Sequence, residues 1–512
     1  MYLHEYDFVV CGAGIAGITF ALSLSNKKIK VLLVDEGGIK TPNPDELRKI
    51  YRIKGRKYEE IHNQIRKTFG GTSHLWGGNC IDFQEEDFDN SPIRGRCHWP
   101  FKYEEYLSLS SRAKKLLGLN SSTRREGDNI LLTDYAYFDY WQFCKYPFKF
   151  DEQFFSKLSK KKNIDIFLHA KVIDIFSHDG ITASEVKIFD KNNKKTIKIK
   201  AKKVIMAMGA LENTRFLLNL KQYRVFPNID SNNLIGKNFT EHPNLTIGYL
   251  SKPCDKIIEK FMEFNDGEVI CKLGLIPSRK FLKSEKSLNF IISFWPKFDD
   301  DILLNRLKNY SVHKSKYGHN LWRLIHCVFK SKKRFFSIRK IVLAWLTRQP
   351  ISFEQEQGLF EVRVMLESKL TPESRVLVTP LHSKNKEQHC DVFWKLDRQD
   401  NRTFQAAIKL LKMYVNEMQL GNFILKHTLN NKNLSEVESN TDGHFGHHMA
   451  TTKMGDEFDG VLDLNMRLRG TSNIYVLGPS AFPNVSFANP TLMNMALSIN
   501  LGDYFNEGYP NC

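Results

Sequence analysis

The chain has 512 residues, of which 42% are apolar and 26% are charged, an ordinary balance for a globular protein. This length suggests roughly three domains and allows a large core to form without disulfides or metal ions. Lys and Arg number 75 against 57 Asp and Glu, and the net charge of +18 excludes an acidic or disordered class of protein. The positive excess favours nucleic acid, an anionic membrane or an acidic small molecule as a partner.

The nine cysteines are an odd number and include no C-x-x-C pair. Because this spacing fits neither a zinc site nor a disulfide framework, we expect buried thiols in a reducing compartment and no metal. No run approaches the ~18–20 apolar residues of a membrane span, and the N-terminus shows no signal-sequence pattern. These features predict a cytoplasmic protein.

The first forty residues carry a dinucleotide-binding pattern. An apolar run over residues 6–11 predicts a buried parallel strand that leads into Gly12-x-Gly14-x-x-Gly17 and then into helical spacing. Gly12 permits the tight turn, and Gly14 lets the backbone approach a pyrophosphate at the helix N-terminus. Gly17 allows close packing, and Asp35, at the end of a second predicted strand, accepts bonds from ribose hydroxyls. The motif does not choose between FAD and NAD, but its N-terminal position favours FAD.

The rest of the chain alternates between loops and short elements. A polar, basic stretch over 40–67 is expected to be exposed, and the glycine-rich residues 69–79 are expected to lie against something flat or charged. Period-two segments predict a β-meander before a strand at 203–208, and an apolar helix is predicted near the C-terminus. The predicted meander strands are 164–168, 171–176, 183–189 and 195–199, later strands are 359–366 and 374–378, and the helix is 490–501.

Several short motifs occur one after another along the whole chain. They are Gly70–Ser73, Trp76–Gly78, Trp99-Pro100, Met208–Ala210, Gly236–Pro243, Thr371–Val376, His447–Gly455, Gly470–Val476 and Asn489–Thr491. Together with the N-terminal pattern they resemble the glucose–methanol–choline (GMC) family of FAD-dependent oxidoreductases, and most closely its pyranose-oxidase-like branch. The resemblance implies an α/β fold, with a Rossmann-type FAD domain assembled from separated segments and an α+β substrate domain built on an antiparallel sheet. We predict the FAD domain at 1–244 with the meander inserted, the substrate domain at 245–434, and a return to the FAD domain at 435–512.

The resemblance also implies a cofactor site in which FAD lies over the 70–79 loop. The implied FAD-binding residues are Gly12, Gly14, Ala16, Gly17, Asp35, Gly71, Thr72, Ser73, Trp76, Gly77, Gly78, Asn79, Val172, Gly209, Gly478, Pro490 and Thr491. In relatives that attach FAD covalently, a histidine immediately precedes the loop tryptophan. Here that position is Leu75, and His74 comes one residue earlier. Since adjacent positions on an extended loop point in different directions, we predict non-covalent FAD.

Hydride transfer from an alcohol to flavin N5 requires a base for the hydroxyl proton. The resemblance places His447 at the catalytic-histidine position and Asn489 where a partner holds the alkoxide-like oxygen. Whether the imidazole acts as a base or electrostatically stays open, and His448 is the alternative to His447. Glu212 and His242 are expected to support the fold or the cofactor pocket.

The basic segment 314–348 is the other notable feature. A solvated insertion is the first interpretation, with a membrane-surface helix or a site for an anionic glycosyl substrate as alternatives. Nucleic acid is excluded because no recognition module accompanies the charge.

The predicted function is oxidation of an alcohol group, a CH–OH donor, on a sugar or glycosyl compound, with an electron acceptor that the sequence does not specify. The alternatives are a redox-silent lyase of the same family and a membrane-peripheral protein with a vestigial flavin fold.

Overall fold

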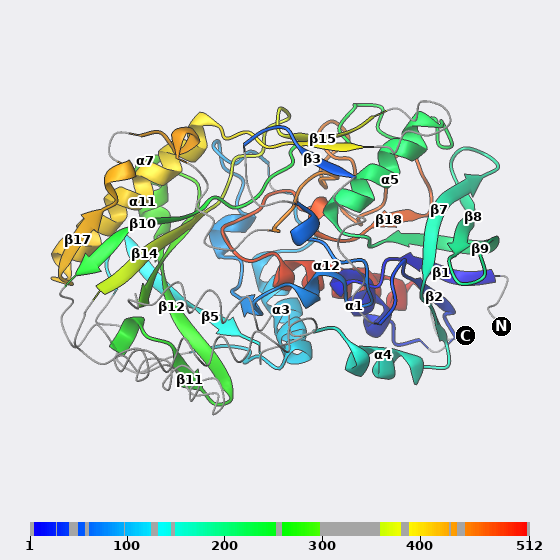
Figure 1. The fold of residues 1–512 in the computed structure, drawn as a ribbon, viewed down its shortest axis with the longest axis horizontal. Coiled ribbons are helices and arrows are strands. Elements are labelled where there is room, and N and C mark those ends of the chain that lie inside the picture. The colour runs from blue at the N-terminus through cyan, green and yellow to red at the C-terminus, as the bar shows by residue number, and fades with distance from the viewer. Residues whose placement is uncertain are drawn as a thin grey trace, which may run out of the picture.

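The computed structural model contains two large β-sheets at opposite ends of the molecule, with helix α12 (Thr491–Glu507) between them (Figure 1). The structure describes residues 5–26, 28–39, 50–56, 61–96, 98–123, 132–144, 149–251, 259–296, 359–379, 389–429, 432–437 and 446–508. The segment 314–348 and His444 lie outside these residues. The predicted α/β class with a second, antiparallel sheet is confirmed, while the predicted domain boundaries stay predictions.

The first sheet contains the parallel core of a doubly wound fold. Its parallel strands lie in the order β6, β2, β1, β9, β18. Strands β2 and β6 lie on one side of β1, whereas β9 lies on its other side. This switch in strand order, between β1 and β9, is the position where such folds bind dinucleotides. The bounds are β6 Ile164–Phe167, β2 Val31–Val34, β1 Glu5–Cys11, β9 Lys195–Met206 and β18 Ile474–Val476.

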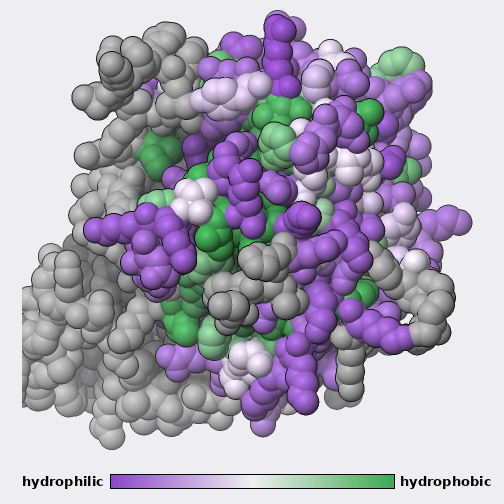
Figure 2. Space-filling model, turned by 90° about the vertical axis from the view of Figure 1, so that its right-hand side faces the viewer, coloured by the Kyte–Doolittle hydropathy of each residue, from purple (hydrophilic) through white to green (hydrophobic). Residues whose placement is uncertain are grey.

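The long strand β9 takes part in both an antiparallel and a parallel pairing. Its first half pairs antiparallel with β8 (Ala183–Asp190), which pairs with β7 (Ala170–Ser177), and its second half pairs parallel with β1. The two strands predicted at 195–199 and 203–208 are therefore one continuous strand. Lysines alternate with less exposed residues along its first half, and the face of the molecule at this end is mainly hydrophilic (Figure 2).

The second sheet is antiparallel and has two unlike faces. Its order is β17, β10, β14, β13, β12, β5, β4, with β11 beside β12. Even-numbered apolar residues of β14, such as Val362 and Val364, pack against helix α11 (Arg398–Glu417), whereas the odd-numbered Arg363 and Met365 lie on the opposite face. The bounds are β17 Asn422–Leu425, β10 Asn244–Ser251, β14 Leu359–Leu366, β13 Phe290–Pro296, β12 Val269–Pro277, β5 Ala136–Phe143, β4 Asn79–Cys80 and β11 Phe264–Asp266.

A small third sheet joins β3 (Tyr51–Ile53) to β16 (Cys390–Phe393) and β15 (Arg375–Val378). Tyr51 is buried and Ile61 is buried, so the expectation of an exposed stretch over 40–67 is wrong for its described second half. The apolar core of this sheet includes Trp394, which explains why a polar-looking segment folds inward. Residues 40–49 and 57–60 lie outside the described part of the chain.

The helices complete the packing of the parallel sheet. Helix α12 packs against α1 and α3, and a Cβ at Gly502 would lie 1.8 Å from Ser23 Oγ, so glycine permits the close approach to α1. No helix among the described residues is long and apolar enough to cross a membrane. The bounds are α1 Ile15–Ser23, α3 Tyr103–Leu117, α4 Glu152–Ser159, α5 Ala210–Gln222 and α7 Arg279–Glu285; the 3-10 turns are η1 Ile61–Asn63, η2 Gly71–His74, η3 Glu85–Phe88, η5 His427–Leu429, η6 Leu434–Glu436 and η7 Pro479–Ala481.

Candidate active site

A cavity of about 630 Å³ connects the carboxyl edge of the parallel sheet with one face of the antiparallel sheet. Gly12 follows β1, Asp35 follows β2, Gly209 follows β9 and Gly478 follows β18, so the ends of four parallel strands contribute to its lining. The carboxyl ends of parallel strands are where open α/β sheets bind their ligands. The cavity therefore lies at the position that the dinucleotide motif predicts.

The glycine-rich turn after β1 fits a bound pyrophosphate. Gly12 has a φ of +108°, and a Cβ there would lie 2.5 Å from the carbonyl oxygen of Ala207. A Cβ at Gly17 would lie 2.1 Å from the carbonyl oxygen of Gly12, so only glycine fits against the turn at this position. A Cβ at Gly14 would meet no atom within 4 Å, and Gly14 lines the cavity. The N-terminus of α1 thus presents bare backbone to the cavity, the surface that a phosphate group requires.

Asp35 supports this turn through the backbone. Its two carboxylate oxygens accept N–H groups from Ala13 and Gly37, each at 2.8 Å. Burial raises the pKa of Asp35 to about 6, although the two backbone N–H groups oppose the shift. Each oxygen keeps a second lone pair, so binding of ribose hydroxyls remains compatible with this geometry. Sequence reasoning missed Glu36, which also lines the cavity and pairs with Lys67 at 2.7 Å.

The 69–79 loop packs directly on the dinucleotide turn. Gly71 has a φ of +53°, and a Cβ there would lie 3.2 Å from Gly14 Cα. Residues Gly71–His74 form one 3-10 turn, so the expectation of an extended loop is wrong for this part. A ring nitrogen of His74 lies 2.9 Å from the carbonyl oxygen of Phe69, and Leu75, not His74, lines the cavity.

The remaining predicted cofactor residues divide into two groups. Those that line the cavity are Ala16, Thr72, Trp76, Gly77, Asn79, Val172, Pro490 and Thr491. Ser73 and Gly78 lie behind the lining. The Ser73 hydroxyl donates to the Gly70 carbonyl oxygen at 2.8 Å and accepts the Phe150 N–H at 3.0 Å, while Gly78 packs against Cys144. Their contacts shape the loop, and their roles toward a cofactor stay predictions.

The two predicted catalytic residues, His447 and Asn489, line the same cavity. The backbone N–H of His447 donates to both carboxylate oxygens of Glu241, at 3.1 and 2.8 Å, and the N–H of Gly446 donates at 2.9 Å. Burial raises the pKa of Glu241 to about 7, against the effect of these backbone donors. The carboxylate therefore fixes the backbone that carries His447.

The amide of Asn489 has a defined orientation. The indole N–H of Trp141, on β5, donates to Asn489 Oδ1 at 3.1 Å. An indole nitrogen can only donate, so this contact identifies the oxygen and leaves Nδ2 as the donor that Asn489 offers to other groups. A donor is what the predicted role toward an alkoxide-like oxygen requires.

His448 lines the same cavity as His447 but differs from it in its surroundings. It is buried and packs near the Phe239 ring, with ring centroids 5.7 Å apart. Burial lowers the pKa of His448 to about 4. His242, expected to support the fold or the cofactor pocket, is in direct contact with the candidate base, because its Nδ1 is 3.0 Å from Nδ1 of His447. The E-H-P motif at 241–243 was the available signal, but nothing local in it indicates a partner so distant in sequence.

The antiparallel sheet supplies the far wall of the cavity, and sequence reasoning missed it. Arg363 and Met365 of β14, Ser293 and Trp295 of β13, and Asn244 of β10 line the cavity with Trp141. Arg363 Nε and Nη2 donate to Glu361 at 3.2 and 2.7 Å, and its Cζ lies 5.3 Å from the Trp295 ring centre. The alternation of apolar and polar residues in 359–366 predicts a strand with one apolar and one polar face. It does not indicate which part of the structure the polar face contacts.

A buried polar network supports the loop before Asn489. Arg94 donates to both oxygens of Glu367 at 2.6 Å and lies 3.4 Å from Asp87 Oδ1. Asp87 in turn accepts the Ser486 hydroxyl at 2.5 Å. Burial raises the pKa of Asp87 to about 7, although Arg94 opposes this shift. The network therefore joins the 484–486 loop to the antiparallel sheet through groups that water does not reach.

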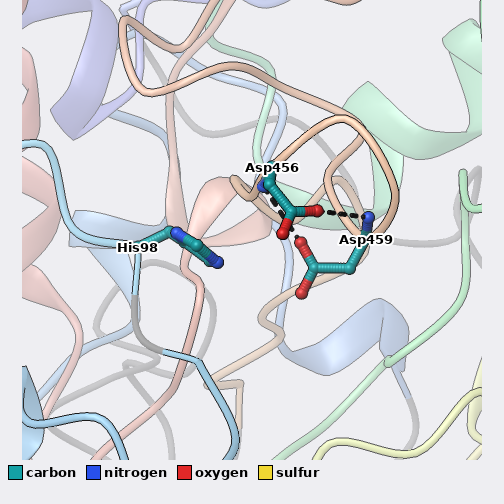
Figure 3. Close-up of side chains that lie close together, drawn as sticks. All are labelled: His98, Asp456 and Asp459. Atoms are coloured by element: carbon teal, nitrogen blue, oxygen red, sulfur yellow. Dashed lines mark hydrogen bonds between the residues drawn. The ribbon is translucent and has the colours of Figure 1, made fainter.

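A second cluster, outside the cavity, has the composition of a metal site. His98, Asp456 and Asp459 lie close together, and the backbone N–H of each aspartate donates to the carboxylate of the other (Figure 3). Asp456 also pairs with Arg96, and Asp459 pairs with Lys453, each at 2.7 Å. Each carboxylate therefore already accepts a backbone N–H within the 456–459 loop and pairs with a cation. The two aspartates do not require a metal ion to balance their charge.

Comparison with known proteins agrees with this geometry. Residues 372–498 match the family described as GMC oxidoreductase, and residues 6–235 match the pyridine nucleotide-disulphide oxidoreductase family. No curated protein matches the chain.

Solved structures show the same fold over nearly the whole length. Pyridoxine 4-oxidase from Mesorbium loti is 14% identical with a TM-score of 0.56, covering 98% of this chain and 100% of that one. A fungal aryl-alcohol oxidase is 13% identical with a TM-score of 0.58 and full coverage of both chains, 100% each. An FAD-dependent oxidoreductase from Chaetomium thermophilum is 14% identical with a TM-score of 0.53, covering 98% and 99%.

These matches define a flavin-dependent oxidoreductase fold with a dinucleotide-binding N-terminal part and a C-terminal GMC oxidoreductase domain. Residues 372–498 belong to the GMC oxidoreductase domain family, and residues 6–235 to the pyridine nucleotide-disulphide oxidoreductase domain family.

Proposed function

We propose that this protein oxidises an alcohol group of a sugar or glycosyl compound, with FAD as cofactor and His447 as the base. The observation that carries the proposal is that His447 and an oriented Asn489 line the same cavity, which begins at the dinucleotide turn. The pyranose-oxidase-like branch and a cytoplasmic location are part of the proposal, and the buried free thiols of Cys11, Cys80, Cys144, Cys271 and Cys390 support a reducing compartment.

Each of these site residues has a separate role in the proposed reaction. His447 takes the hydroxyl proton of the donor, and Asn489 Nδ2 donates a hydrogen bond to the oxygen from which that proton leaves. Glu241 holds the backbone under His447, and Trp141 holds the Asn489 amide. When bound along the turn and the 69–79 loop, FAD supplies the acceptor for the hydride that the alcohol carbon loses.

The far wall of the cavity supports a polyhydroxylated donor. Trp141 and Trp295 offer apolar ring surfaces, while Arg363, Ser293 and Asn244 offer polar groups on the same face. A mainly apolar wall with a few placed polar groups is the usual composition of a small-molecule site. Glu361 partly neutralises Arg363, so the wall suits hydroxyl groups at least as well as a full negative charge.

Arg363→Ala is expected to weaken substrate binding. Loss of hydrogen bonds from a charged group costs about 1.5–3 kcal/mol, or roughly 10- to 100-fold in KM, with a smaller change in kcat. Steady-state kinetics with any donor that reduces the flavin would measure both constants. Arg398→Ala, at an exposed position outside the cavity, is the matched control. An unchanged KM in the Arg363 variant would contradict its role in substrate recognition.

FAD is expected to be released by acid. A histidine ring that contacts a backbone carbonyl and does not line the cavity is poorly placed to bond to the cofactor, and this is the situation of His74. After precipitation with acid, the yellow colour should therefore appear in the supernatant. Colour retained in the pellet would contradict non-covalent binding.

Anaerobic titration of the purified protein with alcohols and sugars, including phosphorylated and nucleotide sugars, tests the proposed function. Loss of the flavin band at ~450 nm on addition of a donor is the expected result, because only a redox reaction reduces FAD. A product formed without change in this band would favour the redox-silent lyase. Protein that carries no FAD and binds anionic vesicles would favour the membrane-peripheral alternative.

A further inference from the structure

His242 is a second buried histidine beside the candidate base. Its side chain is 0% exposed, and its Nε2 lies 3.3 Å from the carbonyl oxygen of Val485. A carbonyl oxygen can only accept, so Nε2 carries a proton. Burial lowers the pKa of His242 to about 4, which keeps the ring neutral near pH 7. A neutral ring with its proton on Nε2 has a lone pair on Nδ1.

That lone pair faces His447. The two Nδ1 atoms are 3.0 Å apart, and at this distance one of them must donate. Since Nδ1 of His242 accepts, Nδ1 of His447 carries the proton. The opposite tautomer of His447 would place two lone pairs against each other.

We infer that His242 is a positioning residue that fixes His447 in the tautomer with its proton on Nδ1 and its lone pair on Nε2. This is the tautomer in which Nε2 can receive a proton from a donor in the cavity, so the functional consequence rests on the proposed function. Glu241 acts with His242, because its Oε1 lies 3.9 Å from His447 Nδ1. In its ionised form, the Glu241 carboxylate at that distance stabilises the imidazolium that forms when His447 takes the proton.

Two substitutions test the two hydrogen bonds of His242, to His447 and to Val485, independently of each other. In His242→Asn the amide oxygen replaces Nδ1 as the acceptor for His447. In His242→Gln the longer amide reaches toward Val485 and leaves His447 without that acceptor. His427→Gln, at an exposed position in η5, is the matched control.

The first measurement is ¹⁵N NMR of the histidine rings, with the His447 signals identified by their loss in His447→Gln. Wild type, His242→Asn and the control should show His447 protonated on Nδ1, whereas His242→Gln should show a mixture of tautomers. Wild-type His447 protonated on Nε2, or an unchanged tautomer in His242→Gln, would overturn the inference.

The second measurement is the rate of flavin reduction at saturating donor. It should fall roughly 10- to 100-fold in His242→Gln, with KM and bound FAD little changed, because supporting partners of active groups contribute on this scale. His242→Asn should retain most of the wild-type rate. Equal rates in both variants would overturn the positioning role. If no donor reduces the wild-type flavin, the proposed function fails, while the NMR result still decides the tautomer.

Discussion

The His447→Ala variant is expected to retain FAD and to lose alcohol-driven flavin reduction by about 10²- to 10⁴-fold, the usual contribution of a general base. The FAD should remain because the turn after β1, the 69–79 loop and the strand ends all line the cavity, and the substitution alters none of them. Stopped-flow absorbance near 450 nm under anaerobic conditions measures the rate, and the visible spectrum measures bound FAD.

The neighbouring histidine provides the discriminating comparison. His448→Ala removes a ring that packs near Phe239 and not against His242. If the His448 variant loses reduction and the His447 variant keeps a near-wild-type rate, the base is His448 and the assignment is wrong. If both variants lose bound FAD, neither rate informs on the base, so FAD content is measured first.

Arg94→Ala is expected to destabilise the folded protein by about 3–5 kcal/mol, because it leaves Glu367 and Asp87 buried without their cation. The side chains of Glu367 and Asp87 are 1% and 0% exposed, so in the folded protein their charge is compensated by the guanidinium and not by bulk water. Thermal and denaturant unfolding, each at the same saturating FAD concentration, would measure the loss, since bound cofactor shifts apparent stability.

Arg96→Ala is the matched control for this substitution. Arg96 lies two positions along the chain and pairs with Asp456 at a similar distance, but its side chain is 72% exposed. Exposed ion pairs contribute little, so the control should unfold almost as wild type does. Equal destabilisation of the two variants would show that the Arg94 network is not the source of the effect.

Local patterns predicted the dinucleotide half well. The strand predicted at 6–11 and the tight turn after it depend on interactions between near neighbours in sequence, and the structure has both, with Asp35 at the end of β2. The strand predicted at 359–366 is also present, as β14 of the antiparallel sheet. The strand at 195–206 was divided in two because its lysine-rich middle looks like a break, although pairing with both β8 and β1 keeps it continuous.

Contacts between distant segments were not predictable from one sequence. His242 and His447 are 205 positions apart, and Trp141 and Asn489 are 348 apart, so no local spacing indicates that they meet. Arg363 was read only as part of a strand, because its role depends on which layer covers that face. The buried segment around Tyr51 was misjudged because its apolar partners, Trp394 and Val392, come more than three hundred residues later.

The sharing of strand β9 between β1 and β18 affects how the molecule is assembled during synthesis. Strand β18 and helix α12 come from residues 474–507, yet β18 pairs with residues 204–206 of β9, and α12 packs against α1 and α3. Long-range pairings of this kind form slowly, and domains fold as units once their segments are available. A nascent chain on the ribosome therefore has an uncompleted nucleotide-binding sheet until residues 474–507 have emerged. During that time the unpaired edge of β9 and the apolar surface awaiting α12 are exposed, so we expect the growing chain to depend on chaperones more than a protein whose cofactor domain is contiguous.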